Sequence, residues 1–459
     1  MLFEHFPDNW RTSTLEELCT GEAAGIQTGP FGSQLHQEDY VEDGTPIITV
    51  EHLLENRISH KNTPRVSQFD RERLAKYTLR VGDIVFSRVG SVDRRSIVRS
   101  EESGWLFSGR CLRVRPNKSK IDPNYLSHYL GHPLVKGHLR SIAVGATMPS
   151  LNTKLLSGIE VLLPISVTEQ KAIAHILGTL DDKIELNRKT NETLETMAKA
   201  LFKSWFVDFD PVRAKIEGRP TGLPAEISDL FPDSFEDSEL GEIPSGWVIR
   251  SVSEITERVA MGPFGSNIKV STFVESGVPV ISGAHLKGVL LQDADYRFVT
   301  EEHSLRLANS CVSSGDVVFT HAGTIGQVAL IPENSEYIKY VLSQRQFYAR
   351  PLRRSLRHYL LMFFHSEKGK HELLSNTSQT GVPSIARPAT FLKSIRMPLP
   401  GEDLLILFDQ MMSDLVTRMR SITGNTSNYV SIRDTLLPKL ISGEIRIPDA
   451  EKMLEEVDI

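Results

Sequence analysis

Lysine and arginine gather in two segments of this chain, one in each half, while acidic residues lie mostly elsewhere. The first segment contains Arg71, Arg73, Lys76, Arg80, Arg88, Arg94, Arg95, Arg99, Arg110, Arg113, Arg115, Lys118 and Lys120. The second contains Lys339, Arg345, Arg350, Arg353, Arg354, Arg357, Lys368 and Lys370. Cations at this density neutralise phosphates, and arginine can also hydrogen-bond to base edges. The segments therefore indicate a nucleic-acid partner; an ordinary solvated surface is the alternative for either segment alone.

The two basic segments belong to two copies of one sequence pattern. The string TGPFGSQL from Thr28 returns as MGPFGSNI from Met261, and VGDIVFSRVGSV from Val81 returns as SGDVVFTHAGTI from Ser314. Further matches are MPSL from Met148 with VPSI from Val382, and GIEVLLP ending at Pro164 with SIRMPLP ending at Pro400. A repeat of this order predicts two domains with the same fold.

The copies keep their glycines and apolar strands but differ at polar positions in the intervening loops. Gln34 corresponds to Asn267, Arg88 to His321, and Arg94 with Arg95 to Gln327 with Val328. Because binding residues commonly lie on loops of a rigid scaffold, we expect each copy to read a different half-site of double-stranded DNA. The candidate DNA-binding residues are Ser33, Gln34, Arg88, Arg94, Arg95, Ser266, Asn267, His321, Arg345, Arg353 and Arg354.

The GPFGS loop present in both copies is open to two interpretations. Its glycines favour a tight turn that serves as scaffold. The alternative is a loop that turns backbone N–H groups toward a phosphate.

Sequence motifs for catalysis are missing. The chain contains no GxxxxGK[ST] phosphate loop, no HExxH pair, and no [DNS]PP[FYW] string of the kind found in amino-methylating DNA enzymes. The cysteines Cys19, Cys111 and Cys311 are scattered and form no CxxC pair. We therefore expect a protein that binds no metal or cofactor itself and catalyses no reaction alone.

Two long segments with apolar residues at seven-residue spacing follow the two copies. The first carries Ile173, Leu180, Asn187, Leu194 and Leu201, and the second carries Phe408, Leu415, Ile422, Tyr429 and Leu436. This spacing predicts two helices that pair as an antiparallel coiled coil within the chain, with packing of each helix on its own domain as the alternative. Gly424 and Asn425 leave the continuity of the second helix open.

Length and composition fit this organisation. A chain of 459 residues is long enough for two or three domains, and a net charge of −6 shows that the basic character is local. No apolar run is long enough for a membrane span, and we expect a cytoplasmic protein. The predicted boundaries are 1–167 and 243–402 for two mixed α/β recognition domains, 168–210 and 403–445 for helical spacers, 211–242 for an exposed acidic linker, and 446–459 for an acidic tail.

In this arrangement the chain resembles the specificity subunits of type I restriction-modification systems. The segments that carry the resemblance are IPSGW at Ile243, GPFGS and GD[IV]VF in both halves, ALFKSWFVDFDPV at Ala200–Val212 and TLLPKLISGEIRI at Thr435–Ile447. The resemblance implies two target-recognition domains, each reading half of a split asymmetric DNA site, with helical spacers that set the gap.

The resemblance also implies partners: two adenine-methyltransferase subunits that bind S-adenosylmethionine, and restriction subunits that use ATP and Mg²⁺ to translocate and cut DNA. The alternative function is a stand-alone bipartite DNA-binding regulator without methylase partners. A single-chain enzyme that methylates or cleaves DNA by itself is a further rival.

Overall fold

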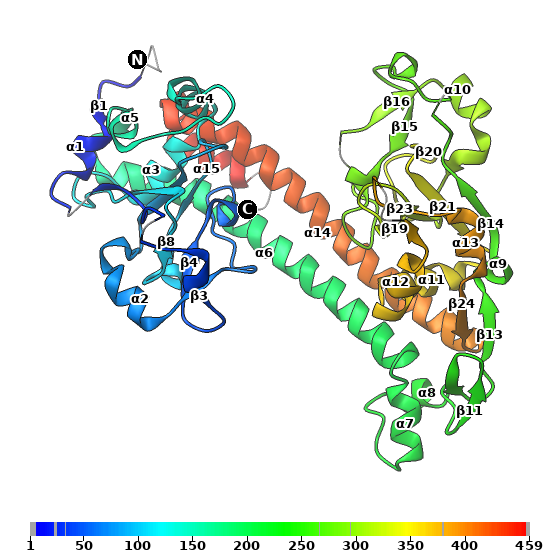
Figure 1. Cartoon of the computed structure of the whole chain (residues 1–459). Coiled ribbons are helices and arrows are strands. Elements are labelled where there is room, and N and C mark those ends of the chain that lie inside the picture. The colour runs from blue at the N-terminus through cyan, green and yellow to red at the C-terminus, as the bar shows by residue number, and fades with distance from the viewer. Residues whose placement is uncertain are drawn as a thin grey trace. The chain divides into compact units, whose positions relative to one another are not determined.

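The structure is a computed structural model that describes residues 6–22, 25–32, 34–265, 267–293, 295–378 and 381–455 (Figure 1). The chain forms two compact units. The first unit comprises Met1–Leu186 and Asn425–Ile459, and the second comprises Asn187–Gly424. Each unit therefore contains one copy of the repeat and one half of each long helix.

The first unit is built on a four-stranded antiparallel sheet, β2-β9-β6-β7. A second sheet has the order β3-β5-β4-β8, in which β4 and β8 are parallel, and β1 pairs with β10. The strands are β1 (Trp10–Thr14), β2 (Ile26–Thr28), β3 (Tyr40–Val41), β4 (Thr45–Ile48), β5 (Arg65–Val66), β6 (Ile84–Ser87), β7 (Arg95–Ile97), β8 (Leu106–Phe107), β9 (Cys111–Val114) and β10 (Glu160–Pro164). The helices are α1 (Leu15–Cys19), α2 (Gln68–Arg73), α3 (Pro123–Leu130), α4 (Pro133–Ile142) and α5 (Thr153–Ser157).

The second unit repeats the topology of the main sheet, and its smaller sheet differs in which side carries the added edge strand. Its main antiparallel sheet has the order β14-β21-β18-β19, its smaller sheet has the order β16-β15-β20-β17, and β13 pairs with β24. These strands are β13 (Val248–Ser251), β14 (Thr256–Met261), β15 (Val278–Ile281), β16 (Arg297–Val299), β17 (Cys311–Val312), β18 (Val317–Thr320), β19 (Val328–Leu330), β20 (Tyr340–Leu342), β21 (Gln346–Pro351) and β24 (Arg396–Leu399). A short pair, β22 (Thr377–Ser378) and β23 (Ser384–Ile385), and helices α9 (Val252–Ile255), α10 (Glu301–Arg306), α11 (Arg357–His365), α12 (Glu367–Leu374) and α13 (Pro388–Ser394) complete it.

The central strand of each main sheet is buried on both faces. Along β6, Ile84 and Phe86 belong to one hydrophobic cluster and Val85 to another. Along β18, Val317 and Phe319 likewise belong to one hydrophobic cluster and Val318 to another. Successive side chains of a strand point to opposite faces, so the β-branched and aromatic GD[IV]VF segments separate two cores in each unit.

Each long segment after a repeat copy is one continuous helix: α6 runs from Val167 to Phe206, and α14 runs from Glu402 through Gly424 to Ser442. The α6 helix leads from the first unit into the second, and α14 leads back. The predicted fold class, two homologous mixed α/β domains with an antiparallel pair of long helices, is confirmed.

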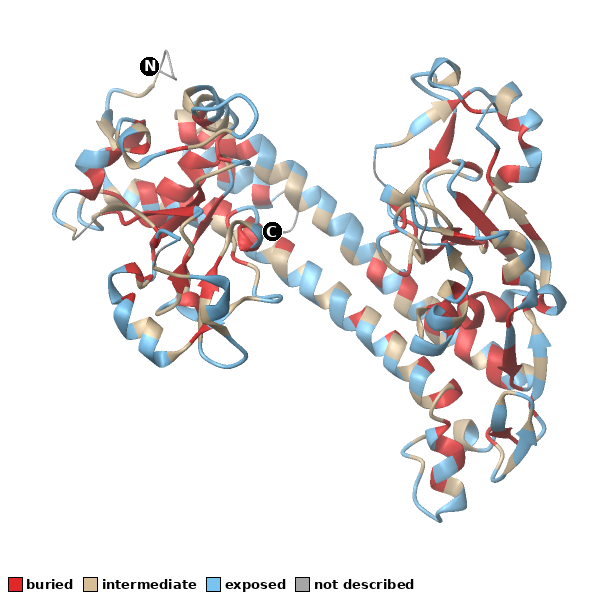
Figure 2. Ribbon diagram, in the orientation of Figure 1, coloured by how far each residue is buried: buried red, intermediate tan, exposed pale blue. Residues whose placement is uncertain are grey.

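The seven-residue stripe packs on the domains as well as between the helices. In the first unit, Ile173 and Leu180 of α6 share a core cluster with Leu436 of α14. In the second unit, Leu194 lies in one cluster with Phe408, with Leu201, Leu415 and Ile422 packed at its edge. In Figure 2 the buried positions of α6 gather where the helix lies against a domain, and residues 185–193 are exposed or half-buried. Both interpretations of the stripe therefore hold.

The prediction of an exposed linker at 211–242 was wrong. The segment folds as α7 (Asp210–Ile216), α8 (Ala225–Ser228) and a hairpin of β11 (Phe235–Ser238) with β12 (Gly241–Pro244). Val212 and Phe231 are buried in the core of the second unit, and the Phe231 ring lies 5.2 Å from that of Trp205. The acidic side chains face solvent, but a few spaced apolar residues are enough to bury the segment.

The predicted acidic tail at 446–459 is also folded in its described part. Residues Ile447–Glu455 form α15, and its Ala450 and Leu454 are buried in the core of the first unit. The remaining four positions, 456–459, lie outside the described residues. Within the described part of the chain, no helix combines the length and the apolar character needed to cross a membrane.

Candidate nucleic-acid interface

Four loops meet at one end of the main sheet in the first unit, and we call them the first tip: residues 29–34, 88–94, 108–110 and 144–151. Backbone hydrogen bonds join them. The amide of Gly29 donates to Cys111 O at 3.1 Å and that of Arg88 to Arg110 O at 2.8 Å. The amide of Leu151 donates to Arg88 O at 2.9 Å. The loop that follows β6 is thus held on both sides.

The second unit has an equivalent second tip, formed by residues 262–267, 321–327, 343–345 and 382–385, with the same bonds. The amide of Gly262 donates to Gln346 O at 2.8 Å and that of His321 to Arg345 O at 2.9 Å. The amide of Ile385 donates to His321 O at 2.9 Å. The two copies therefore share one backbone frame at their tips.

The first glycine of each GPFGS loop is required by close packing of backbone. A Cβ on Gly29 would lie 2.1 Å from Ser108 O, and one on Gly262 would lie 2.0 Å from Ser343 O. Only glycine fits such an approach. The geometry supports the scaffold interpretation of the loop.

The two tips differ in charge at their central position. In the first tip, Arg88 donates through Nη1 to Gly109 O at 3.3 Å, and its guanidinium lies 5.5 Å from the centre of the Phe31 ring. In the second tip, Nε2 of His321 lies 3.1 Å from Gln344 O. Burial lowers the pKa of His321, so a neutral imidazole stands where the first tip has a cation.

Three arginines at the tips are exposed and make no ion pair among the described residues: Arg94, Arg110 and Arg345. Unpaired exposed cations are available to DNA phosphates. Arg110 was not among the candidates chosen from the sequence. The repeat register contained the signal, because Arg110 and Arg345 accept the equivalent backbone bonds from Arg88 and His321.

The polar candidates of the GPFGS loops are placed differently in the two tips. Gln34 is half-buried and accepts a bond from Tyr77 Oη at 2.7 Å, whereas Asn267 is exposed. The candidates Ser33 and Ser266 lie outside the described residues.

Arg95 does not belong to this surface, which corrects the prediction of a DNA contact. It lies on β7 and is only 2% exposed. Its Nε donates to Ser127 O at 2.6 Å and its Nη1 to Glu55 Oε1 at 3.0 Å. A Cβ on Gly131 would lie 1.8 Å from Arg95 Nη2, so this glycine leaves room for the guanidinium. Arg95 is a structural residue of the first unit.

Arg353 and Arg354 are also not brought together with the second tip. They follow β21, whose opposite end carries the tip loop 343–345. Arg353 pairs with Glu402 at 2.6 Å and Arg354 with Glu333 at 2.8 Å. These two candidates lie on a different surface of the second unit.

Part of the basic segments serves the domain interiors. Asp83 of the first GD motif receives two bonds from Arg115, at 2.7 and 2.6 Å, and Asp316 of the second receives two from Arg350, at 2.8 and 2.7 Å. The hydrogen bonds that Arg350 donates to Asp316 raise the pKa of Arg350. The GD motif therefore fixes an arginine in each unit, Arg115 directly after β9 and Arg350 on β21.

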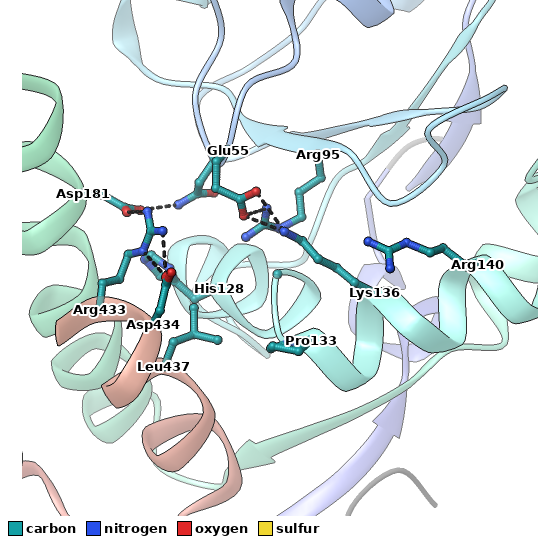
Figure 3. Close-up of a pocket in the computed structure, with 12 residues that line it drawn as sticks. Glu55, Arg95, His128, Pro133, Lys136, Arg140, Asp181, Arg433, Asp434 and Leu437 are labelled. Atoms are coloured by element: carbon teal, nitrogen blue, oxygen red, sulfur yellow. Dashed lines mark hydrogen bonds and ion pairs between the residues drawn. The ribbon is translucent and has the colours of Figure 1, made fainter. Parts of the chain in front are cut away.

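A polar cavity of about 370 Å³ lies in the first unit, between the recognition domain and the two long helices (Figure 3). Lys136 reaches Glu55 at 2.8 Å, and Asp181 of α6 is 3.1 Å from Arg433 of α14. Burial opposes ionisation of Glu55, but Arg95 and Lys136 lower its pKa to about 2. Burial lowers the pKa of His128 to about 4.

The described residues contain no cluster of side chains that could hold a metal ion. Each tip is a binding surface formed by loops that carry exposed arginine side chains.

Comparison with known proteins agrees with this interpretation. Residues 7–196 match the model of the type I restriction modification DNA specificity domain. The specificity subunit of the type I restriction enzyme HindI from Haemophilus influenzae is 24% identical over 443 residues, covering 86% of this chain and 92% of that protein. The MjaIX specificity subunit from Methanocaldococcus jannaschii is 24% identical over 345 residues, 72% of this chain and 71% of that protein.

The fold is shared with a solved structure. The crystal structure of a type I restriction-modification S subunit from M. genitalium has a TM-score of 0.55 and 15% sequence identity, and the alignment covers 96% of this chain and 97% of that one. The family match covers the first copy, and the relatives extend over both copies. The first copy of the repeat matches the type I specificity domain, and over both copies the chain is similar to specificity subunits of type I restriction enzymes.

Proposed function

We propose that the chain is the DNA-recognition subunit of a type I restriction-modification complex, in which each tip reads one half of a bipartite, asymmetric double-stranded site. One observation carries the proposal: the two tips have the same backbone frame, but their side chains differ at Arg88 and His321 and at Gln34 and Asn267. A shared backbone frame with different side chains suits the recognition of two different DNA sequences. Contacts to the bases determine which sequence is bound, and the frame positions the side chains that make them.

In this proposal the chemistry belongs to partner chains. Two methyltransferase subunits that bind S-adenosylmethionine methylate adenine, and restriction subunits use ATP and Mg²⁺ to translocate and cut DNA. This chain supplies recognition and a framework of two long helices, and we expect it to act in the cytoplasm. The unpaired cations Arg94, Arg110 and Arg345 supply the part of the affinity that is independent of base sequence.

The proposal is tested by mapping methylated adenines in the host genome with this chain present and deleted. We expect a set of split sites that loses its methylation on deletion. Replacing the second tip loops with those of a relative should then change one half of the site and leave the other half intact. A change in both halves, or an unchanged methylation map after deletion, contradicts the proposal.

The stand-alone regulator is separated from this function by native purification. A tagged chain should retain methyltransferase subunits through a salt wash. Recovery of DNA-binding chain with no such subunit would favour the regulator. The purified chain alone, given S-adenosylmethionine and Mg²⁺, should leave DNA unmodified; methylation or cleavage would favour a self-sufficient enzyme.

A further inference from the structure

Each tip presents an exposed phenylalanine at the same position of its GPFGS loop. Phe31 is 55% exposed and Phe264 is 77% exposed. Within the described residues, neither ring belongs to a hydrophobic core cluster. A large aromatic side chain left in water twice, at equivalent positions, has no explanation in the stability of the domains.

The backbone holds both rings in a defined place. The amide of Gln34 donates to Phe31 O at 2.7 Å, and the amide of Asn267 donates to Phe264 O at 2.8 Å. Each turn is anchored to the sheet by the close approach of its first glycine, described above. The hydrogen bond and the close glycine contact beside each ring are therefore the same in both units.

The surroundings of the rings are basic and contain a second exposed apolar position. Met148 is 66% exposed in the first tip, and its equivalent Val382 is 61% exposed in the second. The unpaired Arg110 and Arg345 flank the neighbouring loops. Apolar side chains among unpaired cations complement a polyanion that also offers apolar surface, as stacked bases do.

We propose that Phe31 and Phe264 are apolar wedges, one for each half-site, which press between base pairs and open a base step whatever the base sequence. The inference rests on the proposed DNA-recognition function. The polar side chains of the tips differ between the copies, whereas the phenylalanine is the same, so its role must be independent of base identity. Wedges of this kind hold DNA bent against the protein.

The test uses the full-length chain with the methyltransferase subunits that co-purify, and a duplex carrying the mapped site with 2-aminopurine at a step in one half-site. Binding of the wild type should raise the fluorescence of the unstacked base in either half-site. Phe31→Ala should abolish the rise in one half-site only and weaken binding about tenfold. Phe264→Ala should do the same in the other half-site.

Two substitutions serve as matched controls. Val81 is exposed just before β6 and Leu352 is exposed just after β21, each at the end of its strand away from the tip. Val81→Ala and Leu352→Ala should leave fluorescence and affinity unchanged. All four variants should unfold at the wild-type temperature, because none of these side chains is buried.

The outcomes separate the wedge from the proposed function. If the wild type binds its site and the phenylalanine variants still give the fluorescence rise, the wedge is overturned, whether or not affinity falls, and the recognition function stands. If the wild-type complex binds the mapped duplex no better than an unrelated one, the proposed function itself fails. Loss of the rise in both half-sites from a single variant also overturns the assignment of one wedge to each half-site.

Discussion

The two recognition domains share a fold, but they attach to the long helices through different chemistry. In the first unit, Arg95, Glu55 and Asn56 meet Asp181 and Arg433 around a polar cavity. In the second unit, the residues equivalent to Arg95 and Asn56 are Val328 and Val289, and both are buried in the main hydrophobic cluster together with residues of α6 and α14.

The difference extends to the helix beneath each junction. Ser127 and His128 of α3 correspond to Leu361 and Met362 of α11. In the first unit, Gly131 leaves space for the Arg95 guanidinium. The equivalent residue of the second unit is His365, and its Nε2 lies 2.9 Å from Val328 O. The comparison teaches that, at these positions, one backbone frame accepts either polar or apolar side chains if neighbouring positions change together. The second unit places its own buried polar contact with α14 elsewhere, where Arg357 Nε lies 3.0 Å from Asp409 Oδ1.

Arg95→Ala should have the largest effect on stability, because Arg95 bonds to Ser127 and Glu55 in the polar junction of the first unit. Removing the guanidinium takes one of two donors from Ser127 O, which keeps its bond from the Gly131 amide, leaves Glu55 without its Arg95 partner and opens a void. We expect a loss of about 4 kcal/mol in the stability of the first unit. The loss of stability is measured by hydrogen exchange with mass spectrometry, because this method reports on each unit separately. The adjacent, exposed Arg94→Ala is the control and should change nothing. Equal exchange in both variants would contradict the structural role of Arg95.

The GD motif gives a second contrast between the units. Asp83 and Arg115 are both buried, with side chains 2% and 9% exposed, whereas Arg350 opposite Asp316 is 30% exposed. We expect Asp83→Asn to cost about 3 kcal/mol, because a buried guanidinium loses its carboxylate. Asp316→Asn should cost about half as much, since water reaches its partner. Unfolding by urea, followed by hydrogen exchange, measures both; a larger cost for Asp316→Asn would invert the comparison.

Acidification should weaken the first unit through His128. The pKa of His128 is lowered to about 4 by burial, from an ordinary value of 6.5, so the unfolded state binds a proton more readily. Stability from the neutral ring is fully present above pH 6.5 and is lost as the pH falls toward 4, by about 2 kcal/mol at pH 5. His128→Met, which copies Met362 of the second unit, should remove this part of the pH dependence. An identical pH profile in the variant would refute the argument.

The smallest expected effect lies at the tips. Arg88→Ala should lower DNA affinity about fivefold and reduce by about 1 the slope of log K against log salt concentration. His321→Ala should leave the slope unchanged, because the lowered pKa of His321 keeps the ring neutral. Filter binding at several salt concentrations provides the measurement. The same slope in wild type and Arg88→Ala would show that Arg88 contacts no phosphate.

The sequence was sufficient for the organisation of the molecule because repetition and periodicity are local signals. The matching of β6 with β18 and both long helices were predictable. The roles of single cations were not. Arg94 and Arg95 are neighbours of the same type, yet one is exposed and the other is paired with Glu55, a distant residue in the chain. Burial of this kind depends on long-range packing that charge density along the chain does not reveal.

The folded linker was missed for a related reason. Acidic composition describes the average surface of a segment, whereas Val212 and Phe231 decide whether it is buried. Gly424 inside α14 shows the converse, since its local preference against a helix is overcome by the residues that pack on either side of it.

The first unit is completed by the C-terminal part of α14 and by α15. Leu436, Leu440 and Ala450 are fully buried in the same core as Trp10 and Leu15, and Gly443 lies against Pro7 and Trp10. During synthesis on the ribosome, the second unit has all its residues before the first one does. The first recognition domain therefore stays incomplete until residues 436–450 have been synthesised, so termination of synthesis before these residues should unfold the first unit.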